Sequence, residues 1–492
     1  MRITHTSVLM TLFTMVIACP LNSQQSIIDK KEEVLKSVEI HQHEIISLSD
    51  QIWEFAETAL EEYHSSELLA DYAEQQGFTV QRGVAEMPTA FIATFGSGEP
   101  IIGIMGEFDA LPGVSQKAVP YREVLHEGAG GHACGHNMFG AGSIGAAVAI
   151  KEMIEAGELS GTIRFYGTPA EEREGGKIYM ARDGLFDDLD VCLDWHPYYR
   201  IEANMQSSQA ISQYKVRFTG KSAHAAMDPW NGRSALDAAE FFTTGINALR
   251  EHVKPSVRMH YVYTEAGNVP NVVPEKAEVW IWIRDVSRSG VSEVSERVKD
   301  IADGAALMAG VDIEVKPDGG MYEIVVNETG ARTLQKNLEF IGPITYTEEE
   351  TDFANKVMEE YGLEPKGLDG AIHPLRETQP IPPGGSTDVG DISHIVPEIT
   401  LYATTAPAGA PWHSWIVVAC GGMSIGHKGT LFASRALATT MVDLFEDGDL
   451  RKQIREEFLE RKGEEVWVPM IPDGPPPVPD YIESPNHPET IH

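Results

Sequence analysis

The stretch IIGIMGEFDALP, residues 101–112, decides the fold, because an apolar run ends there in a Glu-Phe-Asp triplet. The run from Ile101 to Met105 has the length and composition of a buried strand, which places the acidic residues at its carboxyl end. The same design recurs in TIRFYGTPAEE, residues 162–172, and in VCLDWH, residues 191–196. We therefore predict three strands that each deliver reactive side chains at their carboxyl ends.

Stretches with helical spacing separate these strands. Residues near 140–156 and 175–184 have this character, and apolar residues recur at three- and four-residue steps between Lys31 and Gly77. Strands that alternate with helices imply an α/β fold with a mainly parallel, doubly wound sheet, in which ligands bind beyond the carboxyl ends of the strands. The reactive residue types stand at those ends.

The pattern changes near residue 208. A strand-like run near 214–218 is followed by a helical stretch, two more strand-like runs, a second helical stretch and a last strand, at 234–253, 259–264, 277–284, 291–309 and 311–315. The order β-α-β-β-α-β is the ferredoxin-like split pattern. The chain has 492 residues, more than the roughly 250–300 at which one core stops growing.

We therefore predict a catalytic domain formed by residues 24–207 and 323–450. An inserted α+β domain over 208–322 and a Pro-rich C-terminal tail over 451–492 complete the expected organisation.

The composition excludes some partners. The 38 Lys and Arg residues against 74 Asp and Glu residues leave a net charge of −36, which opposes binding to nucleic acid or to an anionic membrane surface. An anionic substrate then needs positive or hydrogen-bonding groups close to it, because longer-range attraction is absent.

The N-terminus is typical of an exported protein. Arg2 precedes the apolar run from Val8 to Ala18, which predicts a signal peptide over residues 1–23 and a periplasmic or secreted location. The residues Val-Ile-Ala-Cys at 16–19 also resemble a lipoprotein cleavage box, so both soluble secretion and a lipid anchor on Cys19 stay open. Without Cys19 three cysteines remain, and an odd number argues against a disulfide framework. Cys134 therefore needs another explanation.

Several residues have the chemistry of metal ligands. Cys134 and His136 lie two residues apart in a glycine-containing segment, and Glu172 and His196 follow predicted strands, while His413 lies in a turn-rich loop. Cysteine, histidine and glutamate bind zinc and its first-row neighbours, and two ions ~3.5–4 Å apart would need about five such side chains.

Glu171 is the candidate general base. Successive residues of an extended segment point to opposite sides, so one carboxylate of the Glu171-Glu172 pair can bind metal while the other stays free. A solvated turn is the alternative for this pair. Covalent catalysis by Cys134 or Ser386 is disfavoured, because no Gly-x-Ser-x-Gly elbow or thiol-protease motif surrounds them.

Other residues are expected to support the site. Asp109, at a strand end, is suited to orient a histidine ligand. His224 follows a strand of the inserted domain and is a further candidate, with a lone surface histidine as the alternative. His132 and His427 are assigned to structure.

Five motifs carry a resemblance to a known family: FDALP at 108–112, HACGHN at 132–137, TPAEE at 168–172, KSAHA at 221–225 and GSTDVGD at 385–391. Over about residues 40–445 the sequence resembles the two-domain metal-dependent amidohydrolases and peptidases that include hippurate hydrolase, indole-acetyl-amino-acid hydrolase and carboxypeptidase G. Within this family it is most similar to the branch that hydrolyses aminobenzoyl-glutamate. The resemblance implies a zinc-peptidase-like catalytic domain and a ferredoxin-like lid or dimerisation domain.

The resemblance also implies roles for individual residues. Two divalent ions per subunit, zinc or manganese, would be held by Cys134, His136, Glu172, His196 and His413, with Cys134 as a bridge, and Glu171 would activate the water. The substrate's carboxylate would be gripped from the inserted domain by Asn271 and Arg284, with Ser386 nearby. His224 would cross a dimer to polarise the carbonyl oxygen.

Two departures from the family pattern bear on these roles. Glu107 stands where exopeptidase relatives carry a metal-binding histidine, which weakens the case for two equally tight ions. Asn137 stands where the hippurate hydrolase branch has aspartate, which favours the aminobenzoyl-glutamate branch.

The expected function is hydrolysis of the amide bond of an N-acyl amino acid or dipeptide with a free carboxylate, with p-aminobenzoyl-glutamate-like substrates favoured. The expected assembly is a homodimer through the inserted domain, with a heterodimer as the alternative. A metal-binding but inactive partner subunit of a hetero-oligomeric hydrolase is the competing function.

Overall fold

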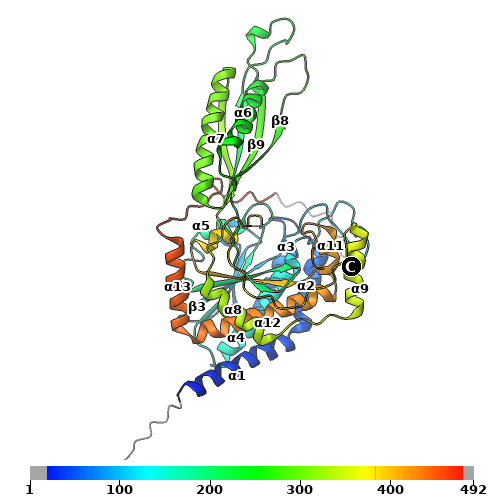
Figure 1. Cartoon of the computed structure of the whole chain (residues 1–492), viewed down its shortest axis with the longest axis vertical. Helices are drawn as coiled ribbons and strands as arrows, with labels where there is room; N and C mark the ends of the chain where they lie inside the picture. Colours follow the sequence, from blue (N-terminus) through cyan, green and yellow to red (C-terminus); the bar gives the residue numbers. More distant parts are fainter. Residues whose placement is uncertain (1–18, 383, 480–492) are drawn as a thin grey trace, which may run out of the picture.

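The computed structural model describes residues 19–382 and 384–479, and these form two regions (Figure 1). The first region, which contains the predicted catalytic domain and keeps that name below, is built on a seven-stranded sheet with the order β1-β2-β4-β3-β5-β11-β6. Its strands are β1 Thr79–Arg82, β2 Phe91–Gly96, β3 Ile101–Glu107, β4 Thr162–Thr168, β5 Val191–Tyr198, β6 Glu202–Ala203 and β11 Glu398–Thr404. The four central strands, β4, β3, β5 and β11, run parallel, and antiparallel strands close both edges.

The register of the central strands brings their carboxyl ends together. Glu107, the last residue of β3, pairs with Thr168, the last residue of β4. On the other side of β3, His196 of β5 pairs with Tyr402 of β11. The residues that follow these strands therefore meet at one edge of the sheet, where the sequence predicted the site.

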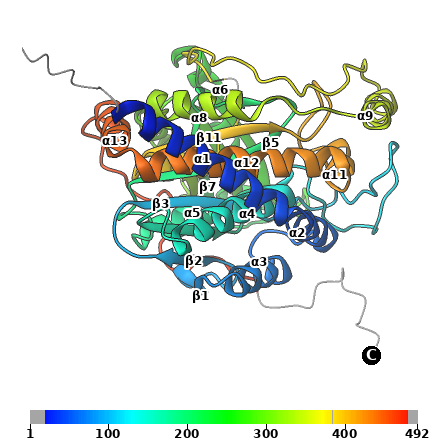
Figure 2. The ribbon, with the colours of Figure 1, turned by 90° about the horizontal axis from the view of Figure 1, so that it is seen from below.

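Helices cover both faces of this sheet. Ile102 and Ile104 of β3 enter a large core with α4 and α12, whereas Met105 faces a second core with α5 and α10. Figure 2 shows α1 and α12 lying across one face. The helices of this domain are α1 Cys19–Ile40, α2 Gln42–Phe55, α3 Tyr63–Gln75, α4 His136–Glu155, α5 Gly176–Arg182, α8 Glu328–Ile341, α9 Glu348–Tyr361, α10 Val389–Ser393, α11 Trp415–Gly421, α12 Ser424–Glu446 and α13 Gly448–Lys462.

The second region is an antiparallel sheet of four strands with the order β10-β7-β9-β8, which rises from the catalytic domain in Figure 1. Its elements are β7 Ala210–Thr219, α6 Ala235–Leu249, β8 Arg258–Glu265, β9 Lys276–Asp285, α7 Arg288–Ala309 and β10 Asp312–Met321. The short 3-10 helices are η1 Val84–Glu86 in the first region, and η2 Pro229–Asn231 and η3 Arg250–His252 in the second. The α/β fold class with a separate antiparallel β-α-β-β-α-β region is confirmed.

The structure also differs from the expectations. The helical run predicted for 31–77 is divided into three helices. α2 ends at Phe55, and the next residue, Ala56, has a φ of 46° in the left-handed region. The first twelve residues of the predicted Pro-rich tail, 451–462, belong to α13. Beyond it the chain is held at the surface, because the Trp467 indole donates a hydrogen bond to Asp391 at 2.8 Å.

Some N-terminal expectations fall outside the described part. Most of the predicted signal peptide, residues 1–18, lies there, and α1 begins at Cys19. Among the described helices no single one is long and apolar enough to span a membrane, and only α11 and α12 pass that test as a pair bent by 73°. The three cysteines beyond Cys19 are buried and free.

Candidate metal centre

The residues predicted to bind metal come from four segments at the carboxyl edge of the sheet. Cys134 precedes α4 and His136 is its first residue, while Glu172 follows β4. His196 lies near the end of β5, and His413 lies in the loop between β11 and α11. The parallel strands thus bring together side chains that are up to 279 positions apart in the chain, from Cys134 to His413.

These side chains form two groups that share one sulfur. Ligand atoms of Cys134, His136 and His196 lie within 4.8 Å of one another, and so do those of Cys134, Glu172 and His413. The Cys134 Sγ is 3.4 Å from the His196 Nε2, and the His413 Nε2 is 3.4 Å from a Glu172 oxygen. All five predicted ligands therefore meet, with Cys134 in the bridging position.

The donor atoms fit a pair of divalent cations. The His136 Nε2 and the Glu172 Oε1 are buried and make no hydrogen bond within the described ranges, although buried polar atoms normally make one. Their close polar neighbours are themselves candidate site groups, a Glu107 oxygen at 3.0 Å and the His413 Nε2 at 3.4 Å. Burial raises the pKa of the Cys134 thiol well above its usual value, so an adjacent cation is needed to hold the thiolate. Thiolate, imidazole and carboxylate together suit zinc and neighbouring metals.

Hydrogen bonds orient the ligands. The His136 Nδ1 donates to Asp109 at 2.8 Å, so its Nε2, which lies 3.0 Å from a Glu107 oxygen, is the nitrogen that could bind a metal ion. The other Asp109 oxygen accepts the backbone N–H of Glu172 at 3.0 Å. The His196 Nδ1 donates to the Pro197 carbonyl at 2.7 Å. Asp109 thus contacts two of the candidate ligands, and one of these contacts is the bond to a histidine that its predicted role needs.

The backbone around the site adopts unusual conformations. Gly135, between two ligands, has a φ of 86°, and a Cβ there would lie 2.8 Å from Pro197, so a glycine is required. Ala170 and His413 have φ values of 61° and 58°, which are uncommon for residues with side chains. The buried Glu62 accepts the Ala170 N–H at 2.9 Å and so holds the turn that presents Glu171.

Glu171 lies beside the ligands, as its predicted role requires. A Glu171 oxygen is within 4.8 Å of ligand atoms of His136 and Glu107. Burial and the nearby carboxylates of Glu107 and Glu172 raise the pKa of Glu171 well above its usual value. A carboxylate with a raised pKa is a stronger proton acceptor when it is ionised.

A buried lysine was missed by the sequence reasoning. The Lys177 Nζ lies 2.6 Å from Glu107 and 2.7 Å from Asp388, and all three side chains are buried. Burial alone would raise the pKa of Glu107, but the charges of Lys177 and His136 lower it below its usual range. A lysine that opens a helix is normally solvated, so only the tertiary structure reveals this ion pair.

The two groups differ in access. The His136 side chain is fully buried, whereas the His413 side chain is 55% exposed. The candidate site is therefore open to solvent on the His413 side.

The predicted substrate-binding residues fall into two pairs. Arg284 lies at the end of β9 nearest the catalytic domain, where it donates to the Ser386 hydroxyl at 2.7 Å. His224 and Asn271 lie in adjoining loops beyond the far end of β7, linked by a hydrogen bond from Ala225 N–H to the Asn271 carbonyl. The ten residues of β7 span about 30 Å. Within one chain these two pairs cannot contact the same small substrate.

The histidines assigned to structure make structural contacts. The His132 Nε2 donates to the Ile52 carbonyl at 2.9 Å, and burial lowers the pKa of His132 to about 3. The His427 Nε2 lies 2.7 Å from Asp50.

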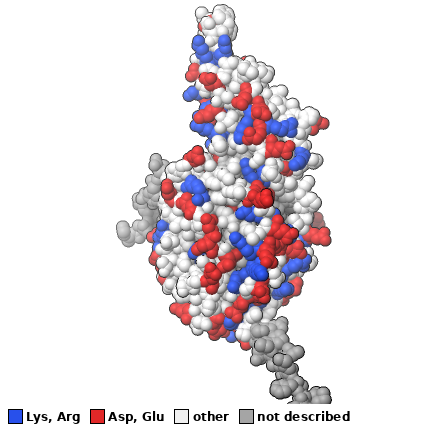
Figure 3. Space-filling view, turned by 90° about the vertical axis from the view of Figure 1, so that its left-hand side faces the viewer, with Lys and Arg blue, Asp and Glu red and all other residues white. Residues whose placement is uncertain are grey.

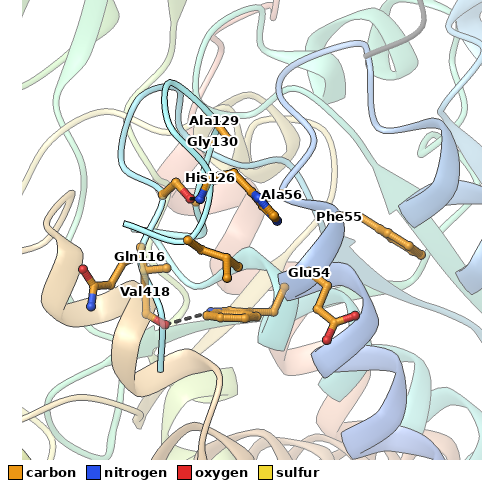
Figure 4. A pocket seen from close by; sticks show the side chains of 12 residues that line it. Glu54, Phe55, Ala56, Gln116, His126, Ala129, Gly130 and Val418 are labelled. Carbon is orange, nitrogen blue, oxygen red and sulfur yellow. Dashed lines mark hydrogen bonds between the residues drawn. The ribbon is translucent and has the colours of Figure 1, made fainter. Parts of the chain in front are cut away.

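On the face drawn in Figure 3, Asp and Glu are spread over both regions among Lys and Arg. A small pocket lies between the end of α2 and the 115–131 loop, where the Trp53 indole donates to the Val418 carbonyl at 2.8 Å (Figure 4). None of the predicted site residues lines it.

Comparison with known proteins places this arrangement in a family. The model of peptidase family M20/M25/M40 matches residues 103–413. The chain is 36% identical over 471 residues to the B subunit of the p-aminobenzoyl-glutamate hydrolase of Escherichia coli (strain K12), a match that covers 90% of this chain and 98% of that protein. It is 29% identical to the human Xaa-Arg dipeptidase over 86% of this chain and 91% of the relative. The resemblance inferred from the five motifs is confirmed.

Solved structures show the same fold. A putative aminohydrolase from methicillin-resistant Staphylococcus aureus superposes with a TM-score of 0.64 at 18% identity, covering 85% of this chain and all of that one. The Bacillus subtilis YXEP protein, described as a dinuclear metal-binding peptidase of the M20 family, superposes with a TM-score of 0.57 at 19% identity, covering 83% and 99%.

Proposed function

The chain belongs to peptidase family M20/M25/M40 and is a metallohydrolase of that family, and we propose that it cleaves the amide bond of an N-acyl amino acid or dipeptide that carries a free carboxylate. Substrates like p-aminobenzoyl-glutamate are favoured. The observation that carries the proposal is the pair of ligand groups sharing Cys134, with Glu171 beside them.

Two divalent ions, zinc or manganese, would be held by Cys134, His136 and His196 on one side and by Cys134, Glu172 and His413 on the other. When bound, such ions lower the pKa of a water molecule towards ~7 and polarise a carbonyl group. The protein's own contribution is to hold these ligands in one orientation through Asp109 and the Pro197 carbonyl.

Glu171 would act as the general base. Its carboxylate takes a proton from the attacking water as the new C–O bond forms, and it returns that proton to the amide nitrogen as the C–N bond breaks. The raised pKa of Glu171, caused by burial and by Glu107 and Glu172, supports this role. A bound cation pair would oppose the raised pKa and keep the carboxylate ionised at neutral pH.

Arg284 would pair with the substrate's carboxylate. Arg284 lies at the base of the inserted domain and contacts Ser386 in the 385–391 loop. The same loop contains Asp388, which forms an ion pair with Lys177. Because the protein's net charge is −36, a local guanidinium is needed to attract an anion.

His224 would complete the site of a second subunit. Its Nδ1 accepts the backbone N–H groups of Ala226 and Met227 at 3.2 Å, so its proton sits on Nε2, which can donate to a developing oxyanion. Because His224 and Asn271 lie about 30 Å from their own catalytic domain, we propose that they act across a dimer formed through the inserted domain.

The competing proposal is an inactive subunit that supports a different catalytic chain. One observation favours it: two relatives are named as the two different subunits of p-aminobenzoyl-glutamate hydrolase. The complete pair of ligand groups beside Glu171 argues against it, because an inactive subunit gains nothing from this arrangement.

The test is turnover by the purified chain alone. With zinc or manganese added, it should hydrolyse p-aminobenzoyl-glutamate or a related N-acyl-glutamate. Inertness towards a panel of N-acyl amino acids and dipeptides, with both metal positions occupied by elemental analysis, would favour the inactive subunit.

We also propose export through the signal peptide at 1–23. The mass of the mature N-terminus from membrane and soluble fractions distinguishes lipid anchoring at Cys19 from simple secretion.

A further inference from the structure

A cluster of aromatic side chains adjoins the candidate metal centre, and the proposed mechanism does not use it. The ring of Tyr198 lies 4.1 Å from that of Tyr199, 5.0 Å from that of Tyr402 and 5.3 Å from that of Trp412, as centroid distances. The Arg200 guanidinium lies 5.7 Å and 5.6 Å from the centroids of Tyr198 and Tyr199. We call these five residues the aromatic wall.

The wall touches both groups of candidate ligands. Tyr198 follows His196 by two positions in β5, so both side chains point to the same side of the sheet. The Tyr402 ring lies 6.4 Å from the His196 ring. Trp412 directly precedes His413, the exposed ligand. The wall therefore begins at the metal centre and extends on the side that is open to solvent.

The whole wall is accessible from solvent. Its five residues are all partly exposed. The Trp412 Nε1 and the Arg200 Nε are buried atoms that make no hydrogen bond in the described part of the chain. The wall therefore offers a ligand its partly exposed ring and guanidinium surfaces.

The charge of the wall favours one class of ligand. Glu202 pairs with Arg200 at 3.0 Å and also accepts two hydrogen bonds from Arg376 at 3.0 and 2.7 Å. Two guanidinium groups share this one carboxylate, so Arg200, Glu202 and Arg376 together carry one net positive charge. This charge disfavours the α-ammonium group of a dipeptide, while a neutral aromatic ring stacks on both tyrosine and guanidinium planes.

We propose that the aromatic wall is the subsite for the acyl group and that it selects N-aroyl amino acids over dipeptides with a free α-amino group. This inference rests on the proposed function and names the acyl half of its substrate. Arg284 then binds the carboxylate half, and the amide lies between them at the metal centre.

The first experiment compares substrates. The ratio of kcat/KM for benzoyl-glutamate to that for acetyl-glutamate should fall about 2- to 13-fold in Tyr199→Leu, and by a similar factor in the separate variant Trp412→Leu. This factor corresponds to the loss of one aromatic ring pair. Phe340→Leu is the matched control. Phe340 lies on α8, its ring is partly exposed, and the Nζ of Lys31 lies 5.9 Å from the centroid of that ring. Metal content is measured in each variant, since Trp412 adjoins His413. An unchanged ratio in Tyr199→Leu with full metal content would overturn the proposal.

The second experiment measures binding without turnover. In a Glu171→Gln background, calorimetry should show tighter binding of benzoyl-glutamate than of acetyl-glutamate or alanyl-glutamate, and Tyr199→Leu should reduce that preference. This preference would support the subsite even if the wild-type chain were inert, in which case only the proposed function fails. Tighter binding of alanyl-glutamate would overturn the subsite.

Discussion

The two regions of the molecule differ in how closely they bring together residues that are distant in sequence. In the catalytic domain, parallel strands end at one edge, so ligands from Cys134 to His413 meet within 4.8 Å in two groups. In the inserted domain, antiparallel strands send their loops to opposite ends, so Arg284 and His224 lie about 30 Å apart. The candidate metal ligands therefore meet within one chain, whereas the proposed substrate site would require two.

The largest expected effect concerns the catalytic domain alone. Glu171→Gln should lower kcat about 10²- to 10⁴-fold with metal content unchanged, because it removes a proton acceptor and leaves the ligands. Glu172→Ala, one residue away, should instead lose metal on dialysis, as elemental analysis would show. Loss of metal from Glu171→Gln would make Glu171 a ligand and remove the base from the mechanism.

The next effect concerns the inserted domain. His224→Ala should lower kcat about 10²- to 10³-fold without releasing metal, because it removes an oxyanion donor. Mixing this variant with Glu171→Gln under conditions of subunit exchange should restore activity, since one site of each mixed dimer is then intact. If exchange is demonstrated and activity stays low, His224 serves its own subunit or lies outside catalysis, and the comparison between the regions fails.

A smaller effect is expected at the base of the inserted domain. Arg284→Ala should lower kcat/KM about 10- to 100-fold for a substrate with a free carboxylate, because a charge-assisted hydrogen bond is lost. The carboxamide analogue should be a poor substrate for the wild type and should lose little further in the variant. Arg284→Lys keeps the charge and tests whether the bidentate geometry matters. Equal losses for acid and carboxamide would assign Arg284 a structural role through Ser386.

The smallest effect concerns the junction between the regions. His394 is buried next to the chain that returns from β10, where its Nε2 donates to the Glu323 carbonyl at 3.1 Å. Burial lowers the pKa of His394 from 6.5 to about 4. Between these two values the unfolded chain binds a proton that the folded chain excludes, so stability falls as the pH drops.

The free energy of unfolding from urea titrations should therefore decrease by up to about 1.4 kcal/mol per pH unit below pH 6.5 because of His394. His394→Gln should show a shallower decrease between pH 7 and pH 5 than the wild type. Parallel curves for the two proteins would mean that His394 does not contribute to the acid sensitivity of the junction.

Much of the site could be predicted because its residues are local to strand ends. Cys134, His136, Glu171, Glu172 and His196 each follow or adjoin an apolar run, and parallel strands bring such ends together in any doubly wound sheet. The β-α-β-β-α-β order of the inserted region was equally visible, since alternating and helical periodicities mark each element.

Other features were decided only by the tertiary structure. The pairing of Lys177 with Glu107 and Asp388 joins residues 70 and 211 positions apart, and nothing in their local sequence indicates burial. The aromatic wall brings Trp412 against Tyr198, although each looks like an ordinary core residue in its own segment. The separation of His224 from Arg284 depends on strand length and direction in three dimensions. Sequence periodicity determines which elements form, whereas long-range packing determines which side chains meet.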